Sequence, residues 1–229
     1  MKTHVKLKVG GDFACFSRPE FKVERISYPV ITPGAARGLL EAIFWKPEFR
    51  WEIREIHILK QIKNAAILRN EISDRQKNPF FIEDRRQQRT SLLLKDVEYI
   101  LFADIKLLPH ATDPLAKYLS QFERRIAKGQ YYHAPYLGNR EFPAWFEPID
   151  SNDTPIALNM DIGTMLFDIA YVKSSSRKEM KFKEHSINKN KSVDGYAETM
   201  FFYAKIENGI LTVPKEKYLE LYQLEARHA

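Results

Sequence analysis

The sequence predicts an α+β protein in which helices alternate with short strands before a strand-rich C-terminal part. Apolar residues recur at every second position over residues 5–9 and 97–105, as they do on half-buried strands. Two other segments begin with a proline behind a capping residue and then show helical spacing. The dipeptide Asn208-Gly209, inside the apolar stretch 199–213, is typical of a tight β-hairpin.

The chain begins with a strand and a helix. The strand over residues 5–9 is followed by a helix that Thr32 caps, that Pro33 begins and that Pro47 ends. Residues 49–58 are predicted to form the next strand. The phase of its apolar residues changes midway, which predicts a β-bulge.

Two stretches lack such periodicity, and we expect them to be irregular. Residues 10–20 contain the pair Gly10-Gly11, which is common in loops. Residues 61–91 are polar and include a run of charged and amide side chains at 83–89. This second stretch is predicted to be an insertion between two strands.

The second helix has the clearest signals at its ends. Asp113 is its predicted cap, Pro114 its first residue and Gly129 the residue that follows it. One face is apolar and packs inward, while the opposite face is polar and basic. The apolar face contains Leu115, Leu119, Phe122 and Ile126, and the basic stripe contains Lys117, Gln121, Arg124 and Lys128.

With a strand expected after the second helix, the order is strand, helix, strand, strand, helix, strand. This is the split βαβ, or ferredoxin-like, order, which RNA-recognition domains share with many unrelated proteins. We therefore expect a ferredoxin-like, RNA-recognition-like βαββαβ domain over residues 1–150. A small antiparallel β-sheet is expected over residues 151–229, where a strand at 165–172 precedes the hairpin.

Composition narrows the function. Cys15 is the only cysteine, which excludes an intramolecular disulfide and a cysteine-based zinc site. The six histidines show no metal-ligand spacing, so we expect neither a metal nor another cofactor. No stretch is apolar and long enough to span a bilayer, and we expect a cytoplasmic protein without a membrane partner. The histidines are His4, His57, His110, His133, His185 and His228.

The positive charge is clustered. The formal net charge of the chain is +6, yet residues 173–191 hold seven basic and two acidic side chains, and residues 117–140 hold five and one. Tyrosines and His133 lie among the second group, and rings that stack on bases beside cations that meet phosphates are suited to RNA. The alternative is a solvated helix face and a basic loop. The candidate RNA contacts are Arg37, Arg124, Arg125, Lys128, Tyr131, Tyr132, Arg140, Lys181 and Lys183.

Several segments resemble one known family. The N-terminal runs GDFACFSRPEFKVERISYP (residues 11–29) and TPGAARGLLEAIFWKP (residues 32–47) are the most specific. Shorter matches lie at 88–97, 137–141, 161–168 and 206–211. These segments resemble the CRISPR-associated "Cas-five" family, in the subtype called d or c of type I-C systems.

The resemblance implies a fold and a function. Members have a ferredoxin-like N-terminal domain followed by a small β-sheet. They bind the repeat hairpin of precursor CRISPR RNA and cut it at the 3′ base, without a metal. They then stay bound, together with other subunits, in the type I-C interference complex.

The resemblance also suggests catalytic positions. Cleavage without a metal needs a base for the 2′-OH, an acid for the leaving 5′-oxygen and a cation beside the phosphorane. The family supplies a tyrosine, a lysine and a histidine, and the matching positions here are Phe44, Lys117 and Tyr118. Phe44 exchanges no proton, so Tyr118 and His133 are the candidates for proton transfer. A non-cleaving subunit that holds the 5′ handle of a guide RNA is the alternative.

Overall fold

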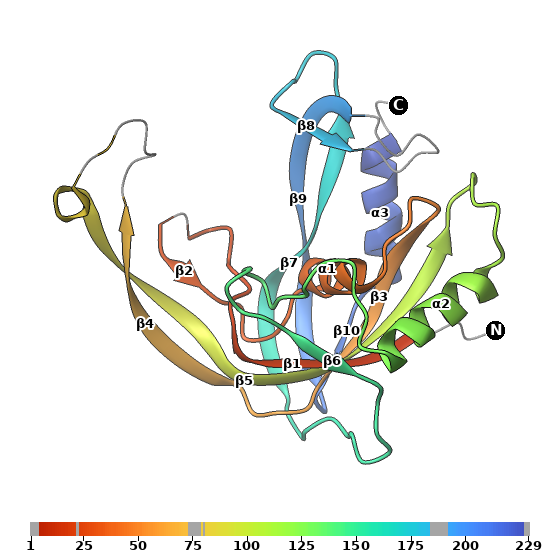
Figure 1. The fold of residues 1–229 in the computed structure, drawn as a ribbon, viewed down its shortest axis with the longest axis horizontal. Coiled ribbons are helices and arrows are strands. Elements are labelled where there is room, and N and C mark those ends of the chain that lie inside the picture. Colours follow the sequence, from red (N-terminus) through yellow and green to blue (C-terminus); the bar gives the residue numbers. More distant parts are fainter. Residues whose placement is uncertain (1–4, 22, 73–78, 80, 184–191, 227–229) are drawn as a thin grey trace.

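The computed structural model describes residues 5–21, 23–72, 79, 81–183 and 192–226. These parts form a mixed α/β structure with one ten-stranded sheet and three α-helices (Figure 1). The main path of the sheet runs in the order β6-β1-β5-β3-β10-β9-β7. The remaining strands β2, β4 and β8 pair with strands of this path.

The first helix and its neighbours follow the local signals. Helix α1 (Pro33–Ile43) is capped by the Thr32 hydroxyl, which accepts a hydrogen bond from the backbone of Ala35. Strand β3 (Phe49–Ile58) shows the predicted bulge as a shift of register between Ile53 and Glu55.

The predicted loop at residues 10–20 is wrong in its first part, because strand β1 (Val5–Ala14) continues through it. Gly10 and Gly11 allow neighbouring residues to pack closely against the strand, and they do not form a turn. A Cβ atom on Gly10 would lie 2.3 Å from the Trp145 ring, and one on Gly11 would lie 2.7 Å from Leu137.

The predicted irregular insertion at residues 61–91 is also wrong. Strand β4 (Lys63–Ile72) pairs with residues 86–95 of β5 (Arg86–Leu107), and the two form an arm that extends from the body of the sheet (Figure 1). The arm was missed because it is covered only near its base, where Leu93 and Leu94 are buried, and most of its other residues are polar or exposed, so its sequence lacks a continuous apolar face. The short helix η1 (Ile82–Asp84) precedes β5, and β2 (Arg25–Ile26) pairs with the arm.

Helix α2 (Leu115–Ala127) lies where the sequence predicts it. Gly129 follows with a φ of +60°, the left-handed conformation expected after a helix. The predicted cap is wrong by one residue, because Pro114 occupies the cap position and Asp113 pairs instead with Lys117. The short strand β6 (Trp145–Glu147) then pairs with β1.

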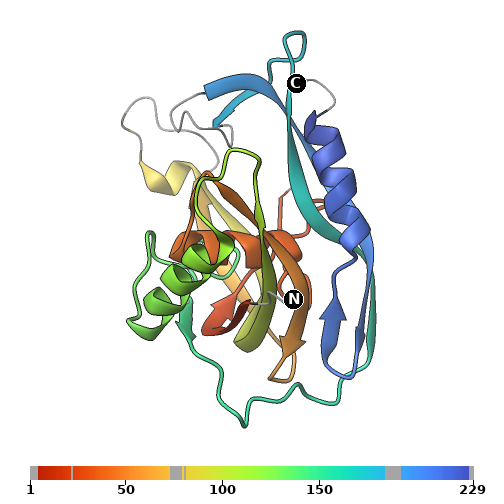
Figure 2. The ribbon, with the colours of Figure 1, turned by 90° about the vertical axis from the view of Figure 1, so that its right-hand side faces the viewer.

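The C-terminal part is built on a long hairpin. Strands β7 (Met160–Lys173) and β9 (Ser192–Glu207) pair along most of their length, and β8 (Met180–Lys183) pairs with β9. A turn at Asn208-Gly209 leads into β10 (Ile210–Thr212), which confirms the hairpin signal. Helix α3 (Lys215–Ala226) was not predicted, and it packs on β7 (Figure 2).

One sheet therefore runs through both parts of the chain. Strand β10 pairs with β9 on one side and with β3 on the other. The hydroxyl of Tyr218 on α3 accepts a hydrogen bond of 2.6 Å from the backbone N–H of Ile53, which ties α3 to β3. The division into domains at about residue 150 stays a prediction.

Candidate nucleic-acid interface

Two connecting loops meet at the N-terminal end of α2. The backbone N–H of Leu108 donates to the carbonyl of Glu48 at 2.9 Å, and Nε2 of His110 lies 3.0 Å from the carbonyl of Pro47. The loop after α1, which contains Phe44, is thereby held beside the loop that leads into α2 and Lys117. The structure thus brings the three positions suggested by the family resemblance into one region.

Phe44 is a core residue. Its side chain is 1% exposed and packs among Phe49 and Phe122, with ring centroids 5.5 and 6.4 Å away. Its carbonyl accepts a hydrogen bond from Nε1 of Trp51. A packing role explains this residue completely.

Tyr118 is buried as well. Only 2% of it is exposed, and its ring lies 5.3 Å from that of Phe49. Burial raises the pKa of Tyr118 above its usual value, because the phenolate would lose its water shell. The hydroxyl is therefore poorly placed to act as a base at neutral pH, and its predicted catalytic role stays a prediction.

Lys117 precedes Tyr118 in α2, but its side chain points about 100° away around the helix and is accessible, with 52% of it exposed. Its ammonium donates to Asp113 at 2.9 Å, and this hydrogen bond raises the pKa of Lys117 above its usual value. The lysine is fully charged at neutral pH. A charged, accessible ammonium at this position suits a phosphate oxygen.

His110 is a residue that the sequence analysis did not single out. The Pro47 carbonyl can only accept a hydrogen bond, so Nε2 of His110 carries the hydrogen and Nδ1 carries the lone pair in the neutral ring. The ring is half-buried and held in orientation. The only signal in the sequence was a histidine three residues before the predicted cap of a basic helix.

The segment Tyr131–His133 lies against the C-terminal end of α1. The backbone N–H groups of Tyr132 and His133 both donate to the carbonyl of Ala42, and Nη1 of Arg125 donates to the carbonyl of Ile43 at 2.6 Å. The guanidinium of Arg125 also lies over the Phe44 ring. Arg125 thus stabilises the end of a helix, and its predicted contact with RNA stays a prediction.

Several exposed side chains around this region are basic or aromatic. Tyr131 and Tyr132 are 53% and 66% exposed, and His133 is exposed with its ring edge-on to Tyr132. The basic stripe of α2 faces solvent at Lys117, Arg124 and Lys128, and Arg140 is exposed as well. The exposed rings of residues 131–133 follow directly after the basic stripe of α2, whereas Arg140 lies next to Glu141, which pairs with Arg25 and Arg69.

The second basic cluster lies elsewhere. Lys181 and Lys183 are exposed on β8, which Figure 1 places near the end of the β7–β9 hairpin, away from α2. Residues 184–191 of the predicted basic stretch 173–191 lie outside the described residues.

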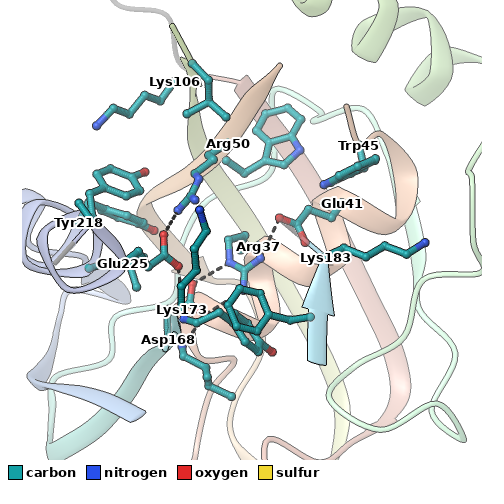
Figure 3. A pocket seen from close by; sticks show the side chains of 18 of the residues that line it. Arg37, Glu41, Trp45, Arg50, Lys106, Asp168, Lys173, Lys183, Tyr218 and Glu225 are labelled. Carbon is teal, nitrogen blue, oxygen red and sulfur yellow. Dashed lines mark hydrogen bonds and ion pairs between the residues drawn. The ribbon is translucent and has the colours of Figure 1, made fainter. Parts of the chain in front are cut away.

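Between β8 and α1 lies a groove of about 960 Å³, here called the central groove (Figure 3). One wall is formed by α1, β3 and the end of β5, and the other by β7, β8 and α3. Arg37 on α1 donates to both carboxylate oxygens of Asp168 on β7, at 2.7 and 2.8 Å, and also to Glu41. Arg50 on β3 pairs with Glu225 on α3. These ion pairs join the two walls.

The predicted phosphate contact of Arg37 is not favoured by this geometry. Two carboxylates hold its guanidinium, and they raise its pKa well above the usual range despite burial. Arg37 therefore has a structural role that its neighbours in the sequence did not indicate, and its contact with RNA stays a prediction.

Two kinds of feature are absent from the described residues. In that part of the chain, no group of three or more His, Cys, Asp or Glu side chains is arranged to hold a metal ion. Among the described helices, none has the length and apolar character that a membrane crossing requires.

Comparison with known proteins identifies the class and then the family. A family model described as CRISPR-associated protein (Cas_Cas5) matches residues 4–214. The CRISPR pre-crRNA endoribonuclease Cas5d of Thermus thermophilus is 60% identical over 226 residues, which cover 98% of this chain and 97% of that protein. The chain belongs to the Cas5d family.

Two further comparisons agree with this assignment. The CRISPR pre-crRNA endoribonuclease Cas5d of Mannheimia succiniciproducens is 38% identical over 239 residues, covering 93% of this chain and 96% of that one. A crystal structure of a CRISPR-associated protein has a TM-score of 0.64 at 21% identity and covers 93% of both chains. The fold is therefore shared with a solved CRISPR-associated protein.

Proposed function

We propose that this protein binds the repeat hairpin of precursor CRISPR RNA, cleaves it without a metal, and stays bound as a subunit of the type I-C interference complex. Two relatives that align over nearly the whole chain are named pre-crRNA endoribonucleases, which supports the reaction. The observation that carries the proposal is the arrangement of side chains at the N-terminal end of α2. There an exposed, charged Lys117 begins the basic stripe, and the loop that leads into the helix holds His110 in a fixed orientation.

The proposed chemistry is attack by the 2′-OH on the adjacent phosphorus, which leaves a 2′,3′-cyclic phosphate and a free 5′-OH. Lys117 would stabilise the charge on the phosphorane. Nδ1 of His110 would take the 2′-OH proton, because its lone pair is free when Nε2–H is bound to Pro47. Tyr118 and His133 remain the candidates from the sequence for the proton given to the 5′-oxygen.

The fold supports binding of RNA at this end. The N-terminal strands lie in the order β6-β1-β5-β3, each antiparallel to its neighbour. Two helices in the order of the split βαβ motif accompany them, so we propose a ferredoxin-like domain for residues 1–150. The sheet of residues 151–229 is proposed as the second domain, and the cytoplasmic location stays a prediction.

A non-cleaving subunit that holds the 5′ handle of a guide RNA is the second candidate. The buried Phe44, at the position of the family's tyrosine, favours it. Both candidates bind RNA, so only product formation distinguishes them.

The deciding experiment incubates the purified protein with a repeat hairpin in EDTA. We expect one cut, a cyclic phosphate on the upstream product, and no cut when the scissile nucleotide carries a 2′-deoxyribose. Lys117→Ala should slow cleavage by about 10² to 10³. Lys217→Ala, which removes a helix lysine that is likewise paired with a carboxylate but lies on α3, should leave the rate unchanged.

The role of His110 has a separate test. His110→Gln keeps an N–H donor for the Pro47 carbonyl but has no titratable nitrogen, so the rate should fall by about 10² to 10⁴ while affinity is kept. Tight binding by the unaltered protein without any product would instead support the non-cleaving subunit.

A further inference from the structure

We infer that Asp113 is a positioning residue of the proposed cut site, whose carboxylate holds the ammonium of Lys117 in place before the RNA binds. This inference rests on the proposed function and deepens it. It gives a role to a residue that the sequence predicts to be a helix cap and that the structure shows not to be one.

The Asp113 side chain does not cap α2. On α1 the capping hydroxyl of Thr32 accepts a hydrogen bond from the backbone N–H of Ala35. On α2 the cap position is occupied by Pro114, whose side chain has no hydrogen-bonding group. The Asp113 carboxylate instead accepts a hydrogen bond of 2.9 Å from the ammonium of Lys117. Among the described residues it has no other hydrogen-bond or ion-pair partner, so this pair is the interaction that its charge makes.

The spacing of the two residues favours the pair. They lie four positions apart, and the acidic residue is nearer the N-terminal end of the helix, which suits both such pairs and the helix dipole. Lysine carries its charge on a flexible four-carbon stem, so an ammonium without a partner samples many positions. A partner that holds it beforehand removes the cost of ordering it while charge develops on the phosphorane.

Asp113 itself lies in a loop that is held in place. This loop joins β5 to α2 and also contains His110. The backbone N–H of Leu108 donates to the carbonyl of Glu48 at 2.9 Å, and Nε2 of His110 lies 3.0 Å from the carbonyl of Pro47. The contacts that orient the imidazole therefore also hold the segment just before Asp113. One short segment thus positions both the ammonium proposed for the phosphorane and the imidazole proposed for the 2′-OH.

The backbone of Asp113 makes a second interaction, with Tyr118. Burial raises the pKa of Tyr118, and the backbone N–H of Asp113, which interacts with the tyrosine hydroxyl, opposes part of that rise. Because this interaction belongs to the backbone, a change of the Asp113 side chain leaves it in place. Substitution of the side chain therefore tests the pair with Lys117.

The charge of Asp113 acts on the RNA as well. Its carboxylate lies 2.9 Å from the ammonium, so it repels the phosphate that the ammonium attracts. Asp113 should therefore weaken binding while it speeds the reaction. These opposite effects distinguish a positioning role from the alternative, an ordinary surface ion pair whose loss changes neither quantity appreciably.

The test measures two quantities for each variant: the rate constant of single-turnover cleavage at saturating protein, and the Kd for a hairpin with a 2′-deoxyribose at the scissile nucleotide. Asp113→Asn keeps the size of the side chain and removes its charge. The cleavage rate should fall by roughly two- to fivefold, while the Kd should tighten by about twofold. Asp113→Glu, which can still pair with Lys117, should retain most of the rate.

Two further variants show whether Asp113 acts through Lys117. Glu123→Gln removes the same charge from an exposed position on α2 and should leave the cleavage rate unchanged. In a protein that already carries Lys117→Ala, Asp113→Asn should cause no further loss of rate, because the group that it positions is gone.

The inference and the proposed function fail separately. The inference is overturned if Asp113→Asn cleaves as fast as the unaltered protein, or if it slows cleavage as much with Lys117→Ala as without it. An equal loss of rate in Glu123→Gln would also overturn it. In each of these cases, cleavage by the unaltered protein still supports the proposed function. If the unaltered protein yields no product from the hairpin in EDTA, the proposed cleavage falls and the inference falls with it.

Discussion

Replacing Asp168 by alanine should destabilise the protein strongly. The carboxylate is 6% exposed, and it accepts two hydrogen bonds from Arg37 and one of 2.8 Å from the backbone N–H of Ile169. Asp168→Ala would leave the Arg37 guanidinium without its main partner and would remove one of the connections between the walls of the central groove.

The expected cost follows from this geometry. Breaking a buried ion pair by removing one partner typically costs about 3–5 kcal/mol. Arg37 would keep its hydrogen bond of 2.8 Å to Glu41, so part of its charge stays compensated. We therefore expect a value near the lower end, about 3 kcal/mol in the free energy of unfolding.

Urea unfolding followed by circular dichroism measures this value. With a slope of about 3 kcal/mol/M, the midpoint should fall by about 1 M. Glu220→Ala is the control, because it removes an exposed carboxylate that pairs with Lys217 on α3 and should cost about 0.2–1 kcal/mol at most. The double variant Arg37→Met/Asp168→Leu should regain most of the loss, since apolar residues often replace a buried pair at little cost.

A midpoint for Asp168→Ala that falls no further than that of Glu220→Ala would refute this reasoning. So would a double variant that is less stable than Asp168→Ala alone. Either result would mean that the pair contributes little and that packing alone holds the walls together.

Three other predictions concern separate parts of the molecule. Replacing Arg124 and Lys128 by glutamine should weaken hairpin binding and reduce the slope of log K against log salt by about 1–2; an unchanged slope would show that they meet no phosphate. Tyr118→Phe should change the cleavage rate less than Lys117→Ala, because its hydroxyl is buried, and an equal loss in single-turnover assays would contradict this. Buried Tyr99 has a raised pKa, whereas an unfolded tyrosine ionises near about pH 10. The contribution of this burial to the free energy of unfolding is thus fully present below that pH and should be lost progressively above it. The prediction is contradicted if the absorbance of tyrosinate reaches its plateau while the protein is still folded.

Local signals predicted the parts of the fold that depend on neighbours in the sequence. The Thr32 cap, the bulge in β3 and the turn at Asn208-Gly209 each need only a few adjacent residues, and all three are confirmed. The β4–β5 arm and α3 were missed for another reason. The arm is covered only near its base, and α3 buries only Tyr218 and Leu221, so neither shows a strong apolar pattern.

The candidate site was predicted in part. The basic stripe of α2 and the exposed tyrosines were visible because helical spacing separates exposed from buried residues. The roles of Arg37 and Arg125 were not, because their partners lie 131 and 82 residues away in the sequence. Likewise, the orientation of His110 depends on the carbonyl of Pro47, 63 residues earlier. Contacts of this kind arise from tertiary packing and leave no local pattern.

Strand β5 connects distant parts of the protein. Its 22 residues, about 70 Å of extended chain, pair with β4 as far as Lys95 and with β3 from Tyr99 onward, and they end beside the central groove. Asp96, at the change of partner, has a φ of +54° and is bound by two lysines, Lys60 and Lys63. One continuous strand therefore connects the arm, through a corner that these two ion pairs hold, to the loop that contains His110.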